Sequence, residues 1–475
     1  MRSLVVPLAG WCEPIDLLPL FAADPMPALL CSATDPGADL NRWSILCAAP
    51  YDTVRWSVGD PGDPFRLLAQ AAEQPGSPSG ASAVEIPFHG GAVGYIGYGV
   101  GRAVESVTPS SRGEDRATRG IPDLLFGLYA WAIVWDHHRR WWGIVSTGLP
   151  EPGSLEGRSA RAARAREDIE AIRSRLAGWT PAHLKEGAPA QSAALHGGGT
   201  PSWLGTSLPR DRYLQMVERA KQLIAEGEVY QVNLSQRLEL PAVSDPVALF
   251  RGIAQHSPAP FSAYLDAGRF QIASASPERF LSLRGSLAES RPIKGTRPRG
   301  DTAALDARLA RDLADSPKDR AENVMIVDLV RNDLGRVCSA GTVRVAEVCR
   351  VESYASVHHL VSVVRGDLAL GRDRGDLLRA MFPGGSMTGA PKRRAMQAIE
   401  DLEPVPRGIY AGAMGYLSFC GAMDLNIVIR TAIAANGRSW LNVGGGIVAD
   451  SVAGDEWQES LDKASSVLKG MGLPG

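Results

Sequence analysis

Apolar and polar positions divide the chain into two halves with different patterns. In the first half, short apolar runs alternate with Gly/Pro turns, as at 42–47 (RWSILC), 90–98 (GGAVGYIGY) and 125–135 (LFGLYAWAIVW). Apolar runs bounded by turn residues are typical of β-strands. Residues 158–176 are rich in Ala, Arg and Glu, which favours a helix with one solvated face. We therefore expect residues 1–177 to form a β-rich domain.

A change in composition separates the two halves. Residues 178–205 include GWTPAHLKEGAPAQ and AALHGGGT, so large apolar side chains are scarce and small or turn-forming residues are common. Such a stretch is typical of a linker. The second domain is then expected to occupy residues 206–475.

Helical spacing of apolar residues predicts three helices in the second half. The first begins after Pro209 and ends before Gly227, and the second begins at Ser316 and runs to about Gly335. Ser316 is a good N-cap and is followed by a proline at the first helical position. The apolar faces are Tyr213, Met216, Val217, Ala220 and Ile224 in the first helix, Val324, Val327, Val330 and Leu334 in the second, and Trp457, Leu461, Ala464 and Leu468 in the third.

Strand-like runs lie between these helices. They cover 229–240, 270–275, 281–283, 414–419 and 425–433, and 442–450 (NVGGGIVAD) is expected to be a strand broken by three glycines. Residues 291–300 carry prolines at 292 and 298 and glycines at 295 and 300. Because proline fixes φ and glycine allows unusual φ values, we expect a shaped loop there.

Composition excludes several classes of protein. The 475 residues carry 50 basic and 52 acidic side chains, a formal net charge of -2, so no global field attracts nucleic acid or an anionic membrane. No apolar segment is long enough for a membrane span. The six cysteines are scattered without a CxxC pair, which favours reduced thiols in the cytoplasm. The eight histidines lack zinc-ligand spacing. Any anion site must therefore be local.

The densest local charge is the segment RPIKGTRPRG at 291–300, with Lys294 at its centre. If Arg291, Arg297 and Arg299 lie near Lys294 in space, their like charge lowers the pKa of its ammonium group. More free amine is then present at neutral pH, and a free amine can act as a nucleophile. The alternative is an ordinary solvated basic loop.

Two pairs of acids lie at i,i+3 on predicted helices, Asp319 with Glu322 and Glu456 with Glu459. Each pair shares one helical face. Carboxylates converging from two helices suit Mg²⁺, which prefers oxygen ligands. The alternative is ordinary exposed acids, with Glu459 paired to Lys463 one turn later.

Three further features are open to two interpretations. The glycines at 444–446 allow backbone N–H groups to approach an anionic oxygen, or they bend a strand. Arg430, next to apolar strand residues, faces a carboxylate or lies at an exposed strand end. His358 and His359 must point to opposite faces of a strand, so at most one is expected to be functional.

A dense series of motifs in the second half is similar to the chorismate-utilising enzymes. The motifs cover about 260 residues and are YQVNLSQR, SPERF, RPIKGTRPRG, ENVMIVDLVRNDLGRV, HLVS, GGSMTGAPK, GIYAGAMGY, IVIRTAI, GGGIVADS and EWQESLDKA. The first half resembles the family more loosely, through RWSILCAAP and GGAVGYIGYGVGR. The resemblance implies an α+β fold of two orthogonally packed antiparallel β-sheets flanked by helices, the anthranilate synthase large-subunit fold. It also implies that the first domain can hold a tryptophan pocket.

The residue after Pro-Ile separates two branches of this family. It is typically alanine in anthranilate synthases and lysine in 4-amino-4-deoxychorismate synthases, and this chain has Lys294. By resemblance, Lys294 is the nucleophile that adds to C2 of chorismate, and Glu278 is the acid that protonates the departing C4 hydroxyl. Ammonia then attacks C4 and the lysine leaves. His359 is a further catalytic candidate.

The resemblance also implies a metal site and a substrate site. Glu322 and Glu459 match Mg²⁺ ligand positions, with Asp319 and Glu456 as outer-shell acids. The metal would bind the ring carboxylate of the substrate. The implied substrate-binding positions are Gly295, Thr296, Ser386, Tyr410, Arg430, Gly444, Gly445 and Gly446.

The implied reaction is Mg²⁺-dependent amination of chorismate at C4 to give 4-amino-4-deoxychorismate, for 4-aminobenzoate and folate synthesis. Ammonia is expected from a separate glutamine amidotransferase subunit in a heterodimer, because no Cys-His glutaminase pattern is visible. The alternative within the family is anthranilate synthase component I, which also eliminates pyruvate. The alternative from another class is a silent partner that binds chorismate or a glutaminase without turnover.

Overall fold

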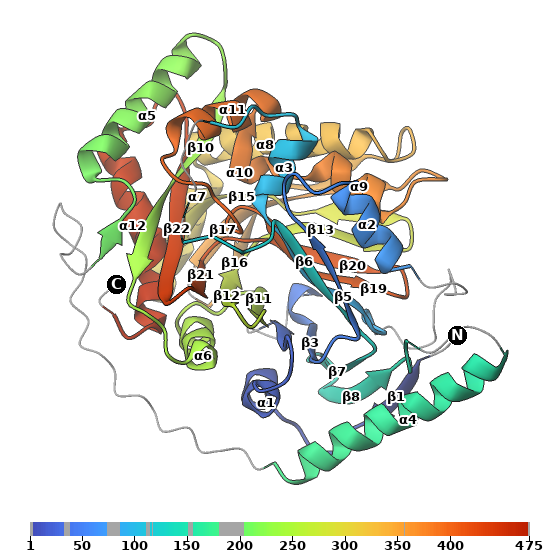
Figure 1. The fold of residues 1–475 in the computed structure, drawn as a ribbon. Helices are drawn as coiled ribbons and strands as arrows, with labels where there is room; N and C mark the ends of the chain where they lie inside the picture. Colours follow the sequence, from blue (N-terminus) through green and yellow to red (C-terminus); the bar gives the residue numbers. More distant parts are fainter. Residues whose placement is uncertain are drawn as a thin grey trace.

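The computed structural model describes residues 3–32, 39–73, 86–110, 115, 117–150, 155–179, 204–355 and 357–473. Its strands form two large sheets in which every pair of neighbours is antiparallel, and helices cover them (Figure 1). The expected α+β class with two antiparallel sheets is therefore confirmed.

The larger sheet, called sheet A, has 12 strands, and the smaller one, sheet B, has 10. In spatial order sheet A contains β1 (Leu4–Pro7), β8 (Trp141–Ser146), β7 (Trp131–Asp136), β3 (Trp43–Cys47), β2 (Ala28–Cys31), β11 (Phe261–Asp266), β12 (Phe270–Ser276), β21 (Thr431–Ala435), β22 (Arg438–Ile447), β10 (Gln231–Leu240) and β18 (Gly389–Ala390), with β9 (Gly205–Thr206) also paired to β10. Sheet B contains β15 (Ile293–Pro298), β17 (Val357–Asp367), β14 (Leu287–Ser290), β13 (Arg279–Arg284), β20 (Met423–Ile427), β19 (Ala413–Ser418), β5 (Gly91–Ile96), β6 (Leu124–Tyr129) and β4 (Asp52–Trp56), with β16 (Arg344–Ser353) also paired to β17.

Both sheets contain strands from both halves of the chain. In sheet A, β2 of the first half pairs with β11 of the second, and in sheet B, β5 pairs with β19. The boundary expected at 178–205 therefore separates two stretches of sequence that share their sheets. Most of that segment lies outside the described residues, so the linker itself stays a prediction.

The helices expected at 158–176, after Pro209, from Ser316 and in the C-terminal segment are present, with one correction to a buried face, and further helices lie between them. They are α1 (Pro14–Phe21), α2 (Pro64–Ala71), α3 (Tyr98–Val104), α4 (Leu155–Ala177), α5 (Arg210–Ala225), α6 (Pro246–His256), α7 (Ala303–Ala314), α8 (Pro317–Gly335), α9 (Arg374–Met381), α10 (Gly385–Thr388), α11 (Lys392–Leu402) and α12 (Ala453–Gly470). Ser316 caps α8 through a hydrogen bond from the Asp319 N–H, as expected. The prediction that Val324 faces the core is wrong, because its side chain is 45% exposed and Ile326 is buried instead.

Two apolar runs that read as continuous in the sequence are divided between the sheets. Residues 425–433, expected as one strand, form β20 in sheet B and β21 in sheet A, with Arg430 between them in the left-handed region at φ +50°. Residues 125–135 similarly form β6 in sheet B and β7 in sheet A. The chain also passes from β12 to β13 through Pro277 and Glu278. An apolar run does not reveal such a crossover, because both sheets accept the same residues.

Two predictions about irregular segments are corrected. Residues 291–300 were expected to be a loop, but 293–298 form the edge strand β15. Proline is tolerated at strand ends and edges, and Gly295, at φ +78°, lies where the register with β17 shifts. The glycines at 444–446 do not break β22, which pairs with β10 across all three. A Cβ on Gly444 would lie 2.0 Å from the Leu234 carbonyl oxygen, so glycine lets these two backbones approach.

One large core cluster joins the sheets to their helices. It includes Trp457 and Leu461 of α12, which packs against α5, α6 and β22. No helix within the described ranges is long and apolar enough to cross a lipid bilayer.

We predict that Leu461→Ala destabilises the fold through loss of core packing. Leu461 is 3% exposed in this cluster, and a large-to-small change at such a site costs about 2–5 kcal/mol. The matched control is Leu305→Ala on α7, where the side chain is 41% exposed and the change should stay within about 0.5 kcal/mol. Urea unfolding of both variants measures the difference, and equal losses would show that α12 is not part of the cooperative core.

Candidate active site

The Lys294 amine lies against the glycine segment of β22. A Cβ atom on Gly446 would lie 3.1 Å from Lys294 Nζ, so a larger residue at 446 would crowd the amine. Burial lowers the pKa of Lys294, and the ammonium of Lys463 acts in the same direction, whereas the carboxylate of Glu322 opposes both. The amine is therefore closer to its free, nucleophilic form than an exposed lysine is.

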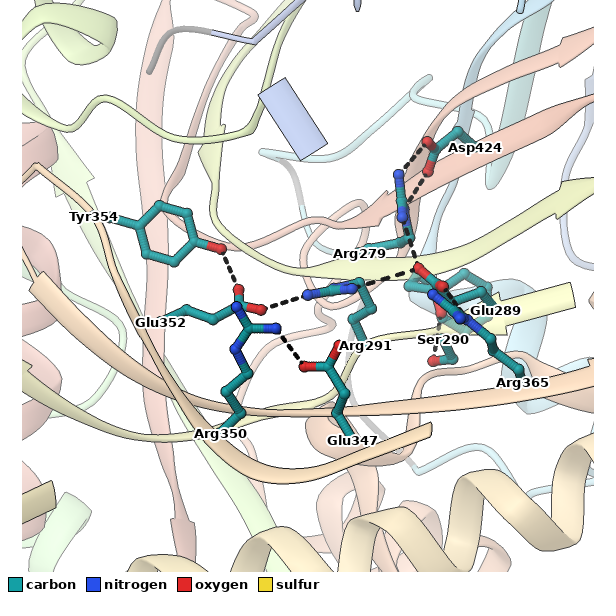
Figure 2. Close-up of polar contacts among 11 residues, drawn as sticks. Arg279, Glu289, Ser290, Arg291, Glu347, Arg350, Glu352, Tyr354, Arg365 and Asp424 are labelled. Carbon is teal, nitrogen blue, oxygen red and sulfur yellow. Dashed lines mark hydrogen bonds and ion pairs between the residues drawn. The ribbon is translucent and has the colours of Figure 1, made fainter. Parts of the chain in front are cut away.

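The flanking arginines do not produce this effect, contrary to the first expectation. The main influences on the Lys294 pKa are burial and the charges of nearby glutamates and Lys463. Each arginine is bound to an acid instead: Arg291 to Glu352 at 2.5 Å, Arg297 to Asp319 at 3.0 Å and Arg299 to Asp306 at 2.7 Å. Figure 2 shows Arg291 between Glu352 and Glu289, in a chain of alternating charges that continues to Arg279 and Asp424. The arginines thus brace β15 against its neighbours.

Glu278 is a buried acid at the crossover between β12 and β13, only 5% exposed. Burial raises its pKa to about 7. The Ser386 hydroxyl, the charge of Lys294 and the Ile293 N–H act in the opposite direction, which places all three groups beside the carboxyl. A carboxyl with a pKa near 7 can donate a proton at neutral pH.

Hydrogen bonds hold this crossover against the one that carries Arg430. The Ser276 hydroxyl donates to the Ile427 carbonyl at 2.6 Å, and the Ile427 N–H donates to the Glu278 carbonyl at 3.0 Å. The Ala275 N–H donates to the Arg430 carbonyl at 3.1 Å. Glu278 and Arg430 therefore lie in two crossovers that are hydrogen-bonded to each other.

The guanidinium of Arg430 is a cation without an acid partner. Burial lowers its pKa, and within the described ranges no ion pair or side-chain hydrogen bond involves it. A partly desolvated arginine in this state can bind a carboxylate through two parallel hydrogen bonds. The structure therefore favours the interpretation of Arg430 as an anion ligand over that of an exposed strand end.

His359 lies close to Arg430. Burial lowers the pKa of His359 to about 3, and the charge of Arg430 adds to this effect, so the imidazole is neutral at pH 7. Its Nδ1 lies 2.9 Å from the Thr296 hydroxyl, and its Nε2 has no hydrogen-bond partner. His358 bonds Ser353 and Asp306 instead, which confirms that the two histidines have different surroundings.

The four expected acids lie on α8 and α12, as predicted. Burial raises the pKa of Glu322, and the charges of Asp319 and Glu459 raise it further, against the effect of Lys294. Burial also raises the pKa of Glu456, which accepts a 2.6 Å hydrogen bond from the Ser451 hydroxyl. The carboxylates of the two helices thus act on one another across the site.

Glu459 forms the ion pair that the alternative interpretation expected. Its Oε1 lies 2.8 Å from Lys463 Nζ, which also donates to the Gly444 carbonyl at 2.8 Å. A Cβ on Gly445 would meet Glu456 at 2.9 Å and Glu459 at 3.8 Å, so both acids also border the glycine segment. Glu459 can therefore pair with Lys463 and still lie in the site.

These acids fit a Mg²⁺ ion that takes only part of its oxygen ligands from the protein. Among the residues that the structure describes, no three or more His, Cys, Asp and Glu side chains converge as a metal cage. Mg²⁺ usually binds one or two carboxylates and keeps waters or substrate oxygens in its octahedron. Glu322 and Glu459 supply that number of carboxylates, and the mutual repulsion of their charges is what a cation would relieve.

The remaining predicted residues divide into two groups. Ser386 borders Glu278, and a Cβ on Gly295 would lie 2.8 Å from the Asp319 side chain. Tyr410 is buried with its ring 5.8 Å from the Arg407 guanidinium. A cavity of about 60 Å³ bordered by Ser32 and Phe261 lies where the two halves meet. Whether this cavity takes tryptophan is not tested by the structure, so tryptophan binding stays a prediction.

Comparisons with known proteins agree with this geometry. The family model for chorismate binding enzymes matches residues 36–469. The chain is 42% identical over 444 residues to aminodeoxychorismate synthase component 1 of Klebsiella aerogenes, covering 90% of each chain, and 42% identical over 383 residues to anthranilate synthase component 1 of Thermus thermophilus, covering 81% of this chain and 78% of that one. The crystal structure of anthranilate synthase component I from Streptococcus pneumoniae superimposes with a TM-score of 0.76 at 32% identity, over 90% of this chain and 92% of that one.

The chain belongs to the chorismate-binding enzymes. The resemblance inferred from the motifs is thereby confirmed for both halves, since the match begins at residue 36. Relatives of both branches are similarly close, so the branch must be argued from the residues of this chorismate-binding enzyme itself.

Two site residues of this chorismate-binding enzyme were missed. Gln231 is 1% exposed, and both of its amide atoms lack hydrogen-bond partners. A Cβ on Gly446 would lie 2.0 Å from Gln231 Nε2, so this amide adjoins the Lys294 amine. Lys463 was considered only as a partner of Glu459. The motifs YQVNLSQR and EWQESLDKA contain both residues, but spacing alone did not distinguish them from structural ones.

The raised pKa of Glu278 predicts a pH-dependent cost in stability. The folded state binds this proton more tightly than the unfolded state, so stability falls as pH rises from 4.5 through about 7. At pH 8 the cost reaches up to about 3 kcal/mol. We expect Glu278→Gln, which mimics the protonated acid, to be more stable than the wild type at pH 8 and nearly equal at pH 4.5.

Urea unfolding across this pH range tests the prediction, with Glu218→Gln on the exposed face of α5 as a control that should show no such trend. A constant difference between wild type and Glu278→Gln across the range would contradict the raised pKa.

Proposed function

We propose that this chain is the aminating component of an aminodeoxychorismate synthase, acting in the cytoplasm. It would replace the C4 hydroxyl of chorismate by ammonia to give 4-amino-4-deoxychorismate. The observation that supports this most strongly is the buried Lys294 amine beside Glu278. The names of the relatives from Klebsiella aerogenes and from other bacteria support the same branch.

In the proposed mechanism, the Lys294 amine adds to C2 of the ring while the double bond shifts. The C4 hydroxyl takes the proton of Glu278 and leaves as water. Ammonia then adds to C4, the bond between C2 and Lys294 breaks, and the lysine returns as free amine. The new ammonium group gives its extra proton to the Glu278 carboxylate, so the net reaction exchanges ammonia for water.

Charge compensation at the two ends of the substrate positions it for this reaction. Chorismate is a dianion, and Arg430 would bind the enolpyruvyl carboxylate, with the backbone at 444–446 and Tyr410 completing that end. Glu322 and Glu459 would hold Mg²⁺, which supplies positive charge for the ring carboxylate when bound. His359 is neutral and would act by hydrogen bonding through Nε2.

Ammonia would come from a separate glutamine amidotransferase subunit. The relatives named component 1 support the existence of a second component. Ammonium salts at high concentration would replace this subunit in an assay of the isolated chain.

The second candidate is anthranilate synthase component I, which the Thermus thermophilus relative favours. Purified protein with chorismate, Mg²⁺ and ammonium chloride distinguishes the two. We expect the product mass of 4-amino-4-deoxychorismate without release of pyruvate. Formation of fluorescent anthranilate together with pyruvate would show that the second candidate is right. Absence of turnover even with a glutaminase added would favour a silent partner.

Lys294→Ala should lower the amination rate by orders of magnitude, because it removes the proposed nucleophile. Lys469→Ala is the matched control, since Lys469 is exposed in the last turn of α12 and should leave the rate unchanged. Stopped-assay product mass gives both rates, and unchanged turnover in Lys294→Ala would remove the covalent step.

Glu322→Gln should raise the Mg²⁺ concentration needed for half-maximal rate by ~10-fold or more, because one ligand charge is lost. Asp328→Asn on the exposed face of α8 is the control and should not change it. Rates over a Mg²⁺ titration in metal-depleted buffer provide the comparison. An unchanged Mg²⁺ requirement in Glu322→Gln would exclude this residue as a ligand.

A further inference from the structure

The structure also contains a cavity of about 210 Å³. It is bordered by α3, by α11 and by the segments 118–123 and 406–409, and none of the residues proposed to act on chorismate lines it. Figure 1 shows α3 and α11 on the same side of the molecule, and an ion pair between Arg102 and Glu400, 2.9 Å long, joins them. The cavity is therefore a second space that the proposed reaction does not use.

The wall of the cavity contains more acidic than basic side chains. Two arginines line it, and each has an acid partner there: Arg102 pairs with Glu400, and Arg407 pairs with Glu403 at 2.6 Å. Asp123 is the third acid of the wall, and among the described residues it forms no ion pair. The wall thus carries one carboxylate beyond its paired charges.

The two carboxylate oxygens of Asp123 differ in their contacts. Its Oδ2 accepts a 2.9 Å hydrogen bond from the Val58 N–H, whereas no hydrogen bond to Oδ1 is present in the described part of the chain. Gly99 also lines the cavity, and a Cβ there would lie 2.2 Å from Oδ1. Glycine at 99 therefore keeps this oxygen uncovered. Burial raises the pKa of Asp123, a cost that a bound cation would offset.

A buried hydroxyl without a partner points to a ligand in the same cavity. Tyr98 lines it, is 3% exposed, and its hydroxyl makes no hydrogen bond. After burial, which raises the pKa of Tyr98, the charges acting on this phenol are those of Arg407, Glu403, Glu400 and Arg102, all of them in the cavity wall. An unpaired buried hydroxyl is costly, so a bound polar group would gain from it.

The rest of the wall is apolar and limits the size of a ligand. It includes Ile121, Ile399, Ile409, Ile433 and Trp440. The volume equals roughly seven water molecules. An anion would find no unpaired cation here, because both arginines already bind acids. A cation with a short apolar body fits both the charge and the surface.

We propose that this cavity binds a small primary ammonium compound, with its ammonium group at Asp123 Oδ1 and the Tyr98 hydroxyl and its hydrocarbon part against the isoleucines. This site is independent of the proposed amination of chorismate. The ammonium group supplies three donors, and the carboxylate and the hydroxyl accept two of them.

A series of ligands of equal shape tests the charge requirement on the unmodified protein. Isothermal titration of the full chain is carried out with n-butylammonium, 1-butanol and butyrate at constant ionic strength. We expect saturable binding of n-butylammonium and at least ~10-fold weaker binding of the other two, because a charge-assisted hydrogen bond is lost. Equal binding of 1-butanol or butyrate, or no saturable binding of n-butylammonium, would overturn the proposal.

Two substitutions then test the residues. Asp123→Asn should weaken n-butylammonium binding by ~10-fold or more, and Tyr98→Phe should weaken it severalfold. Asp211→Asn on the exposed face of α5 is the matched control and should bind as the wild type does. Circular dichroism checks that each variant is folded, and if Asp123→Asn is unfolded, the ligand series on the wild type still decides. Unchanged affinity in folded Asp123→Asn would show that the carboxylate is not the ligand.

Discussion

The candidate site depends on two crossovers, β12 to β13 and β20 to β21, at which the chain leaves one sheet and enters the other. Ser276, Ile427 and Arg430 fasten them together by short hydrogen bonds between residues about 150 positions apart in the sequence. Residues at a crossover take no part in the regular pairing of either sheet. Glu278 and Arg430 occupy these positions, and the acid and the anion ligand of the proposed site are therefore set by how the sheets are connected.

Burial is the main influence on the chemistry of this site. It raises the pKa values of Glu278, Glu322 and Glu456 and lowers those of Lys294 and His359. Each shift costs stability at a pH where the group would be charged in the unfolded chain, because burial disfavours the charged form in the folded protein. Other buried charges of the described residues are paired, as Arg407 with Glu403 and Arg279 with Glu289 and Asp424 are. The contrast separates structural ion pairs from groups that can change protonation.

The sequence predicted the helices that carry the four acids better than the path of the strands. The helical spacing placed Asp319, Glu322, Glu456 and Glu459 correctly, because i,i+3 pairs share a face whatever the helix packs against. The apolar faces of α5 and α12 were also predicted, since burial follows the helical period. The division of 425–433 between two sheets was not predictable, because both strands are equally apolar.

Long-range contacts account for the other corrections. Lys294 was expected to be tuned by neighbouring arginines, but Arg291, Arg297 and Arg299 bind acids that lie between 7 and 61 positions away in the sequence. Gln231 became visible as a site residue only because Gly446, more than 200 positions later, lies beside it. The resemblance to the family singled out Lys294 and Glu278, and the structure shows that both are buried and that burial shifts their pKa values.

The shared sheets also connect the first half to the site. The edge of β11 that does not face β12 pairs with β2, and the edge of β19 that does not face β20 pairs with β5. Without the first half, both edges would present unpaired N–H and C=O groups next to the strands that lead into the two crossovers. The first half therefore supports Glu278 and Arg430 although it supplies neither of them, and its looser similarity to the family is consistent with this supporting role.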